Sequence, residues 1–337
     1  MQYPSINTHV HCRDQGEAYK TTILEQMTLA KSHGRVAVID MPNNKPRTLT
    51  KADVEERNSI AEKNGCKKGY YINIGGTKDV KQLEEAVNLA ETRDNNVTGI
   101  KIFTTGADDD PIVIKHENDL ETFHRNLKDL GYKGVLIPHC EDEKLFRIGS
   151  FNPERPATWD KQRPKEAEVS AIRKIINYAG KAGAEYKIQF PHVTCAESID
   201  VIAENVDYVD MSFEVTPQHL LLSTRDMITK KDLDKKMNPP IRSQEVVDIL
   251  WERLREIVQD GKIPVVSGPD QAVHTLKEKM EGTVFPDGRI TGYLSGCQGE
   301  NYYPSFVQEL RNHGFSSTDM NKILYRNAKV VFPKIKE

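Results

Sequence analysis

Residues 6–14, INTHVHCRD, decide how the rest of the chain is interpreted. Alternate side chains of a strand point to the same face, so His9, His11 and Arg13 share one face, while Val10 and Cys12 share the other. Two imidazoles at this spacing can bind one metal ion, and an arginine beyond them can hold a carboxylate or phosphate through two hydrogen bonds. For His-x-His alone, the polar face of an edge strand is the commoner explanation. The later motifs therefore have to decide between a metal site and the polar face of an edge strand.

Composition narrows the class of partner. The chain has 337 residues, a formal net charge of -3 and scattered basic residues, which argues against nucleic-acid binding and favours an acidic or neutral small molecule. It has no run of about 18 apolar residues, and residues 1–30 lack a signal peptide's apolar core, so we expect no membrane partner and a cytoplasmic location. Five cysteines without a Cys-x-x-Cys pair are expected to be packing residues. We also expect a homo-oligomer, such as a dimer.

Short apolar runs alternate with amphipathic stretches along the whole chain, a pattern that predicts βαβ units and a parallel sheet. One helical stripe, for example, is Leu120, Phe123, Leu127 and Leu130. Eight such alternations favour a single (β/α)8 TIM barrel over residues 1–337, with a doubly wound open sheet as the alternative. The predicted strands are residues 5–11, 36–40, 70–74, 99–103, 135–137, 187–190, 210–215 and 264–267.

Candidate ligands fall at predicted strand ends, where a barrel places its chemistry. A lysine facing the barrel interior is costly to bury unpaired, but reaction with carbon dioxide would make it a carbamate whose two oxygens can bridge two metal ions. Each residue alone has a structural explanation: the lysine can snorkel or pair with a carboxylate, a histidine can be satisfied in the core, and the aspartate can cap a loop. As a set they favour zinc. They are His9, His11, Lys101, His139, His192 and Asp270.

These residues lie in motifs that resemble those of the dihydroorotases of the amidohydrolase superfamily, from about Ile6 to Ala328. THVHCRD followed by IDMPNNKP is highly specific for that family, whereas the other motifs are individually weaker. The others are GIKIF, PHCED, PHVTCAES, EVTPQHLLL, MNPPIRS and DQAVHTLKEK.

The resemblance implies a site with two zinc ions per chain. One ion would be bound by His9, His11, Asp270 and Lys101, the lysine being carboxylated at its side-chain nitrogen by carbon dioxide. The second ion would be bound by Lys101 together with the two later histidines, His139 and His192.

The resemblance also implies a substrate-binding set. Arg13, Asn43 and His274 match positions that hold the substrate carboxylate, and Asn238 matches a residue near the pyrimidine ring. The ordinary explanations are a surface salt bridge for Arg13 and turn positions before proline for Asn43 and Asn238.

The activity implied is the reversible cyclisation of N-carbamoyl-L-aspartate to L-dihydroorotate in pyrimidine biosynthesis. A hydroxide shared by the two zinc ions would attack, with Asp270 as general acid and base. A dihydropyrimidinase, hydantoinase or allantoinase would use the same centre, although most of their substrates lack the ring carboxylate that Arg13 would bind. A non-catalytic scaffold for aspartate transcarbamoylase is the second alternative, and such a relative is expected to lose ligands.

Three features depart from the family or extend it. Gln271 replaces the histidine of the usual Asp-His-Ala-Pro-His, so we expect either the support of Asp270 or the local loop geometry to differ. Many members add a small β-rich domain from both termini, and we expect a barrel without it. Residues 104–111 are expected to be mobile and to close over substrate through Thr104 or Thr105, with a solvated acidic loop as the alternative.

Overall fold

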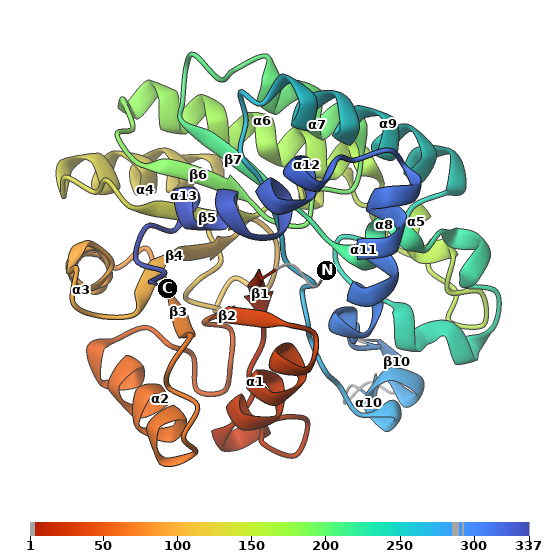
Figure 1. Cartoon of the computed structure of the whole chain (residues 1–337), viewed down its shortest axis with the longest axis horizontal. Coiled ribbons are helices and arrows are strands. Elements are labelled where there is room, and N and C mark those ends of the chain that lie inside the picture. The colour runs from red at the N-terminus through yellow and green to blue at the C-terminus, as the bar shows by residue number, and fades with distance from the viewer. Residues whose placement is uncertain (1–3, 285–289, 292, 337) are drawn as a thin grey trace.

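Eight parallel strands form one sheet in sequential order, and helices surround them (Figure 1). The computed structural model describes residues 4–284, 290–291 and 293–336. Main-chain hydrogen bonds close the sheet: His11 N donates to Gln271 O at 2.9 Å, and Gln271 N donates to His9 O at 3.2 Å. The (β/α)8 barrel is therefore confirmed, and the open sheet is wrong. The strands are β1 (Ser5–Val10), β2 (Arg35–Asp40), β3 (Tyr70–Gly75), β4 (Val97–Phe103), β5 (Val135–His139), β6 (Lys187–Phe190), β7 (Met211–Val215) and β8 (Val265–Ser267).

Helix ends are encoded by local sequence. Thr50 caps α2 by accepting a hydrogen bond from Asp53 N while the Asp53 side chain accepts one from Thr50 N, and Gly261 ends α9 with a φ of +74°. The α-helices are α1 (Ile23–Ser32), α2 (Lys51–Lys63), α3 (Val80–Glu91), α4 (Glu117–Asp129), α5 (Thr158–Gln162), α6 (Lys165–Ala182), α7 (Ala196–Ala203), α8 (Pro217–Leu221), α9 (Gln244–Asp260), α10 (Leu276–Glu281), α11 (Tyr303–Asn312), α12 (Ser317–Asn321) and α13 (Asn327–Val331). Shorter elements are the 3-10 helices Gln15–Glu17, Glu143–Leu145, Thr224–Asp226, Lys230–Lys235 and Gly299–Tyr302, the π-helical turn Lys322–Arg326, and the two-residue strands β9 (Thr283–Val284) and β10 (Ile290–Thr291).

The helical stripes face the barrel, as their spacing predicts. Leu120, Phe123 and Leu127 of α4 are buried, and Leu130, just after the helix, is half-buried. Val80 is the exception in α3: it is the first helical residue and remains 51% exposed. Among the described helices, none combines the length and apolar composition needed to span a bilayer.

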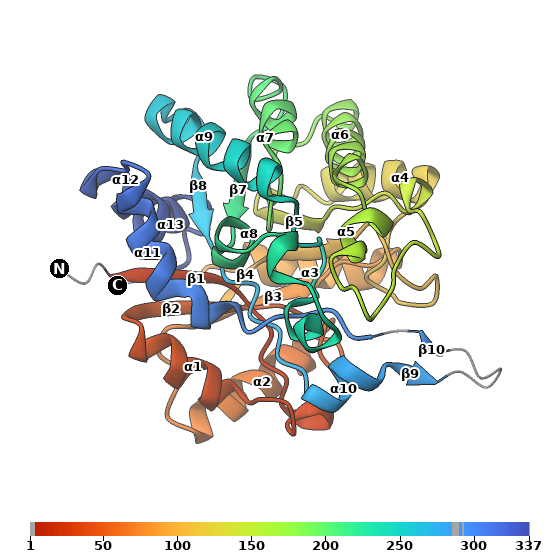
Figure 2. The same cartoon turned by 90° about the vertical axis from the view of Figure 1, so that its right-hand side faces the viewer.

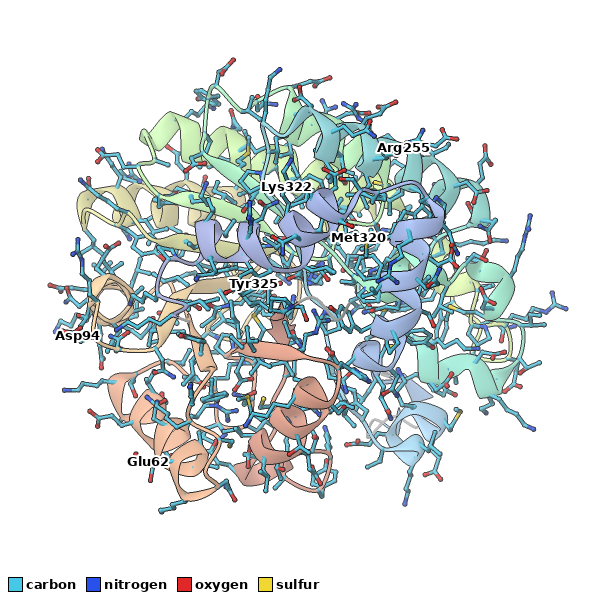
Figure 3. The ribbon with its side chains drawn as sticks, viewed as in Figure 1. Glu62, Asp94, Arg255, Met320, Lys322 and Tyr325 are labelled. Atoms are coloured by element: carbon cyan, nitrogen blue, oxygen red, sulfur yellow. The ribbon has the colours of Figure 1, made fainter. Side chains whose placement is uncertain are left out.

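One end of the barrel is closed by the C-terminal helices. Ile6, Ile39 and Val266 from the strands pack against Val331 and Phe332 of the last helical segment. Figure 3 shows Met320, Lys322 and Tyr325 on the segment that crosses this end, and Figure 2 shows α12 and α13 at one end of the barrel and α10 at the other. Because apolar packing fills this end, the open site must lie at the carboxyl ends of the strands.

Candidate active site

A cavity of about 220 Å³ opens at the carboxyl ends of the strands. The predicted site residues line it with one exception, His274, whose Nε2 lies 3.3 Å from Arg13 Nη2 in the wall. Those that line it are His9, His11, Arg13, Asn43, Lys101, His139, His192, Asn238 and Asp270. Residues separated by up to 261 positions in the chain therefore meet at one rim.

The first group of candidate ligands centres on Asp270. Its Oδ1 lies 2.9 Å from His11 Nε2 and 3.3 Å from His9 Nε2. His9, His192 and Asp270 each offer one ligand atom, and these three atoms lie within 4.8 Å of one another. Such convergence of two imidazoles and a carboxylate suits a divalent cation.

The second group is a histidine pair. His139 Nδ1 lies 3.0 Å from His192 Nε2, and the other ring nitrogen of His139 lies 2.8 Å from Glu141 Oε2. His192 has a φ of +42° and Asp270 one of +44°, in the left-handed region that a residue with a side chain seldom adopts. Backbone strain of this kind collects at functional sites, here at two strand ends that aim candidate ligands into the cavity.

Lys101 is fully buried in β4, and its Nζ has no hydrogen-bond partner. Burial lowers the pKa of Lys101 to about 8, although Asp270 and Glu214 act in the opposite direction. A pKa this low leaves a useful fraction of neutral amine near pH 7–8, and the neutral amine is the form that reacts with carbon dioxide.

Burial also favours the neutral form of three candidate histidines, which is the form that binds metals. It lowers the pKa of His11 to about 4 and the pKa values of His139 and His192 as well. For Asp270, burial acts to raise the pKa, but the nearby His9 and His11 hold it well below its usual range. Neutral imidazoles, an ionised carboxylate and a buried lysine nitrogen fit a pair of divalent cations.

Unpartnered polar atoms gather at this rim. Buried groups are normally hydrogen-bonded, so orphaned atoms mark places where a ligand completes the structure. Within the described part of the chain, five atoms of the predicted site are buried without a hydrogen-bond partner: His11 Nδ1, Arg13 Nε, Asn43 Oδ1, Lys101 Nζ and His274 Nδ1.

Two carboxylates behind the histidines were missed at the sequence level. Glu214 Oε1 lies 2.9 Å from His9 Nδ1, and Glu141 contacts His139 and also accepts a hydrogen bond from Arg163 Nε at 2.9 Å. Both glutamates lie inside motifs of the family resemblance, EVTPQHLLL and PHCED. That location was the available signal, but only the fold shows which histidine each glutamate orients.

Gln271 acts on the local loop geometry, the second of the two expected differences. Its Oε1 accepts a hydrogen bond from Glu300 N at 2.8 Å, and its main chain closes the sheet against β1. The side chain thus fixes the start of the 3-10 helix Gly299–Tyr302, and its link to Asp270 runs through the backbone.

Thr104 is wrong as a substrate contact. Its hydroxyl lies 2.9 Å from His139 O and 3.0 Å from Glu141 O, and it accepts a hydrogen bond from Glu141 N at 2.9 Å. Thr105 does line the cavity, but its hydroxyl donates to Glu143 Oε1 at 2.8 Å. Both side chains therefore hold the base of the 104–111 loop to the segment after β5.

Asn238 lies at the cavity and is also hydrogen-bonded within the protein, whereas the cysteines agree with their predicted packing role. Asn238 lines the cavity, and its Oδ1 accepts a hydrogen bond from Trp159 Nε1 at 3.1 Å. All five cysteines are buried and free, and burial raises the pKa of the Cys12 and Cys140 thiols well above the usual range.

Gly268→Ala tests how tightly the rim is built. An added Cβ would lie 2.3 Å from Glu214 Oε2 and 2.6 Å from Thr8 Oγ1, so we expect a loss of about 1–3 kcal/mol in the free energy of unfolding. Urea titration measures that loss, and metal analysis should show a lower metal content. Gly131→Ala is the control, because its added Cβ meets no atom within 4 Å and only its φ of +70° is strained. Full metal content in Gly268→Ala would contradict the expectation.

Comparison with known proteins places this geometry in a class. No family model matches the sequence. An L-hydantoinase (dihydropyrimidinase) from Arthrobacter aurescens superposes with a TM-score of 0.79 at 20% identity, over 98% of this chain and 71% of that one. A dihydropyrimidinase from Brevibacillus agri gives 0.76 at 19%, over 98% and 72%. The chain therefore has the same barrel fold as these two proteins, and His9, His192 and Asp270 lie together at its rim.

The relatives that match in sequence carry a different name from the structural neighbours. The dihydroorotase of Thermococcus kodakarensis is 32% identical over 279 residues, which are 82% of this chain and 58% of that protein. The dihydroorotase of Anoxybacillus flavithermus is 30% identical over 294 residues, 85% of this chain and 63% of that protein. These comparisons confirm the predicted resemblance to the dihydroorotases. The chain spans about three fifths of the length of these two relatives.

Proposed function

We propose that this protein is a dihydroorotase, which interconverts N-carbamoyl-L-aspartate and L-dihydroorotate. The observation that carries the proposal is Arg13 beside the ligand cluster. Its guanidinium is buried and its Nε has no hydrogen-bond partner. Asn43 and His274 flank it, and Glu17 Oε2 lies 3.7 Å from its Nη1, so one edge of the guanidinium is paired within the protein. A buried cation two residues beyond His11 suits a substrate that carries a carboxylate next to the ring amide.

The metal site belongs to the same proposal. We propose that His9, His11, Lys101 and Asp270 hold one zinc ion, and that Lys101, His139 and His192 hold another. Lys101 would react as the free amine with carbon dioxide, forming an N–C bond and releasing one proton, to give a carbamate. When bound, such a pair of cations supplies a water of lowered pKa and polarises a carbonyl oxygen.

The chain's own residues would carry the proton and orient the substrate. Asp270 is ionised and faces the cavity, so it can accept the proton of the attacking water and deliver it to the leaving ring nitrogen. Arg13, Asn43 and His274 would hold the other carboxylate, which keeps the scissile amide facing the metal ligands. In the cyclisation direction Asp270 would return the proton.

The direct test is turnover by the purified, metal-loaded protein. We expect it to hydrolyse L-dihydroorotate and to cyclise N-carbamoyl-L-aspartate. Turnover of dihydrouracil or hydantoin with none of dihydroorotate would assign the hydantoinase alternative. Absence of both bound metal and turnover would favour the scaffold alternative. Single-domain organisation, a homo-oligomer and a cytoplasmic location stay predictions.

Arg13→Met tests the carboxylate contact. Hydrogen bonds to charged groups contribute about 1.5–3 kcal/mol, so we expect KM for dihydroorotate to rise about 10- to 100-fold with a smaller change in kcat. Any residual hydrolysis of dihydrouracil, which lacks the carboxylate, should be unchanged. Arg47→Met is the control, because Arg47 pairs with Asp110 and does not line the cavity. An unchanged KM in Arg13→Met would remove this residue from the substrate site.

A further inference from the structure

Glu214 joins two parts of the candidate metal site. It lies in β7 with its side chain fully buried. Its carboxylate accepts a hydrogen bond from Thr8 Oγ1 at 2.5 Å and one from His192 N at 3.3 Å, and it lies 2.9 Å from His9 Nδ1. One side chain therefore contacts the strand that carries His9 and the backbone of His192.

This contact determines which nitrogen His9 presents. With Nδ1 donating to Glu214, the free lone pair of His9 is on Nε2, which lies 3.3 Å from Asp270 Oδ1. The carboxylate is held by its three hydrogen-bond contacts and lies directly against Gly268, where an added Cβ would be 2.3 Å from Glu214 Oε2. The His9 ring is thus held in the tautomer and orientation that a metal ligand needs.

The charge of Glu214 is not matched by an arginine or lysine in direct contact, although it acts at longer range on the buried Lys101, whose pKa it raises. Among the residues that the structure describes, the ion-pair contact of Glu214 is with His9. The comparable buried glutamates differ: Glu141 pairs with Arg163, and Glu168 lies 3.6 Å from Arg242. A buried carboxylate without a cationic partner destabilises the folded state unless another cation compensates it.

We propose that Glu214 is a positioning residue for His9 and that the cations at the rim balance its buried charge. The inference rests on the metal site of the proposed function. It follows that metal-free protein carries an electrostatic penalty which metal binding removes. Stability and metal affinity are then linked through one side chain that touches neither substrate nor metal.

Glu214→Gln separates this role from a simple structural one. Glutamine keeps the shape and can still accept from His9 Nδ1 and donate to Thr8 Oγ1, so the variant removes mainly the charge. We expect the Tm of chelator-treated, full-length protein to rise by about 2–4 °C. We expect the Kd for zinc, measured by competition with a chelating dye, to rise about 10- to 100-fold.

A purely structural hydrogen bond predicts a different result, namely a fall in Tm for both the metal-free and the metal-loaded forms. That fall, or an unchanged zinc Kd, would overturn the proposal. Glu214→Asp is the second variant: it keeps the charge but shortens the side chain, so it should weaken zinc binding without raising the metal-free Tm. A metal-free Tm raised by Glu214→Asp as much as by Glu214→Gln would also overturn it.

Two matched glutamates serve as controls. Glu141→Gln leaves Arg163 without its charge partner, so it should lower the metal-free Tm. Glu168→Gln alters a buried glutamate bonded to Thr194 and Ser198, and it should leave the zinc Kd unchanged. If the Glu214 variants behave as expected but the parent does not turn over dihydroorotate, the proposed function fails and this inference stands. If the parent turns it over and Glu214→Gln binds zinc normally, the inference alone fails.

Discussion

Asp270→Asn is expected to lower kcat for dihydroorotate hydrolysis by about 10²- to 10⁴-fold, the range that a positioned acid-base group contributes. Asparagine keeps the shape of the side chain but cannot take up a proton. Because Asp270 Oδ1 lies 2.9 Å from His11 Nε2, the substitution also removes an anionic ligand from the first metal group. The loss should appear in both reaction directions, since one carboxylate moves the proton each way.

Steady-state kinetics in both directions, with the metal content of each sample, measure this effect. Asp109→Asn is the control, because Asp109 is an exposed acid on the 104–111 loop. An Asp270→Asn variant that keeps two metals but has the lowered kcat would locate the defect in proton transfer. A variant with parental kcat would contradict the role of Asp270 altogether.

Lys101→Met is expected to abolish turnover, with a loss of about 10³-fold or more, because the shared ligand of a metal pair supports several kcal/mol of transition-state stabilisation. Lys101 Nζ is fully buried and has no hydrogen-bond partner, so the unmodified amine lacks the direct contacts that normally offset burial of such a group. Intact-mass measurement of the parent under native conditions should show one added carbon dioxide. The variant should lack this mass and bind less metal.

Lys279→Met is the matched control for that substitution. Lys279 is also buried, and burial lowers its pKa to about 8, but its Nζ donates to Lys236 O and Gly296 O away from the ligand cluster. The control should lose stability and keep its metals. Two bound metals in Lys101→Met, or an unmodified lysine in active parent, would disprove the carbamate.

Much of the fold was predictable because periodicity is local. The alternation of apolar runs with helical stripes predicted all eight strands, with small errors at their ends: β4 begins two residues earlier, at Val97, and β5 includes His139. The helical spacing of Val80, Leu83, Val87 and Ala90 predicts a buried stripe, but Val80 is exposed because a residue in the first turn of a helix projects beyond the packed face.

The convergence of the site was predictable for a related reason. In a closed parallel barrel every strand delivers its last residues to the same rim, so polar residues at strand ends must meet. This placed His11, Lys101 and His192 together before any contact was known. The same reasoning misplaced Thr104. Its position after β4 does not reveal that its hydroxyl is hydrogen-bonded to the backbone of the next strand.

The sequence by itself determined the number and order of the barrel strands, the buried face of helices such as α4, and the rim at which the candidate ligands gather, since all three depend on spacing along the chain. Only the tertiary structure decided which side chains meet at that rim, namely Glu214 behind His9 and Arg163 on Glu141. It alone also decided the left-handed backbone conformation at Asp270. These depend on strand register and on the closure between β1 and β8. Such contacts join residues up to about two hundred positions apart, and no local pattern encodes them.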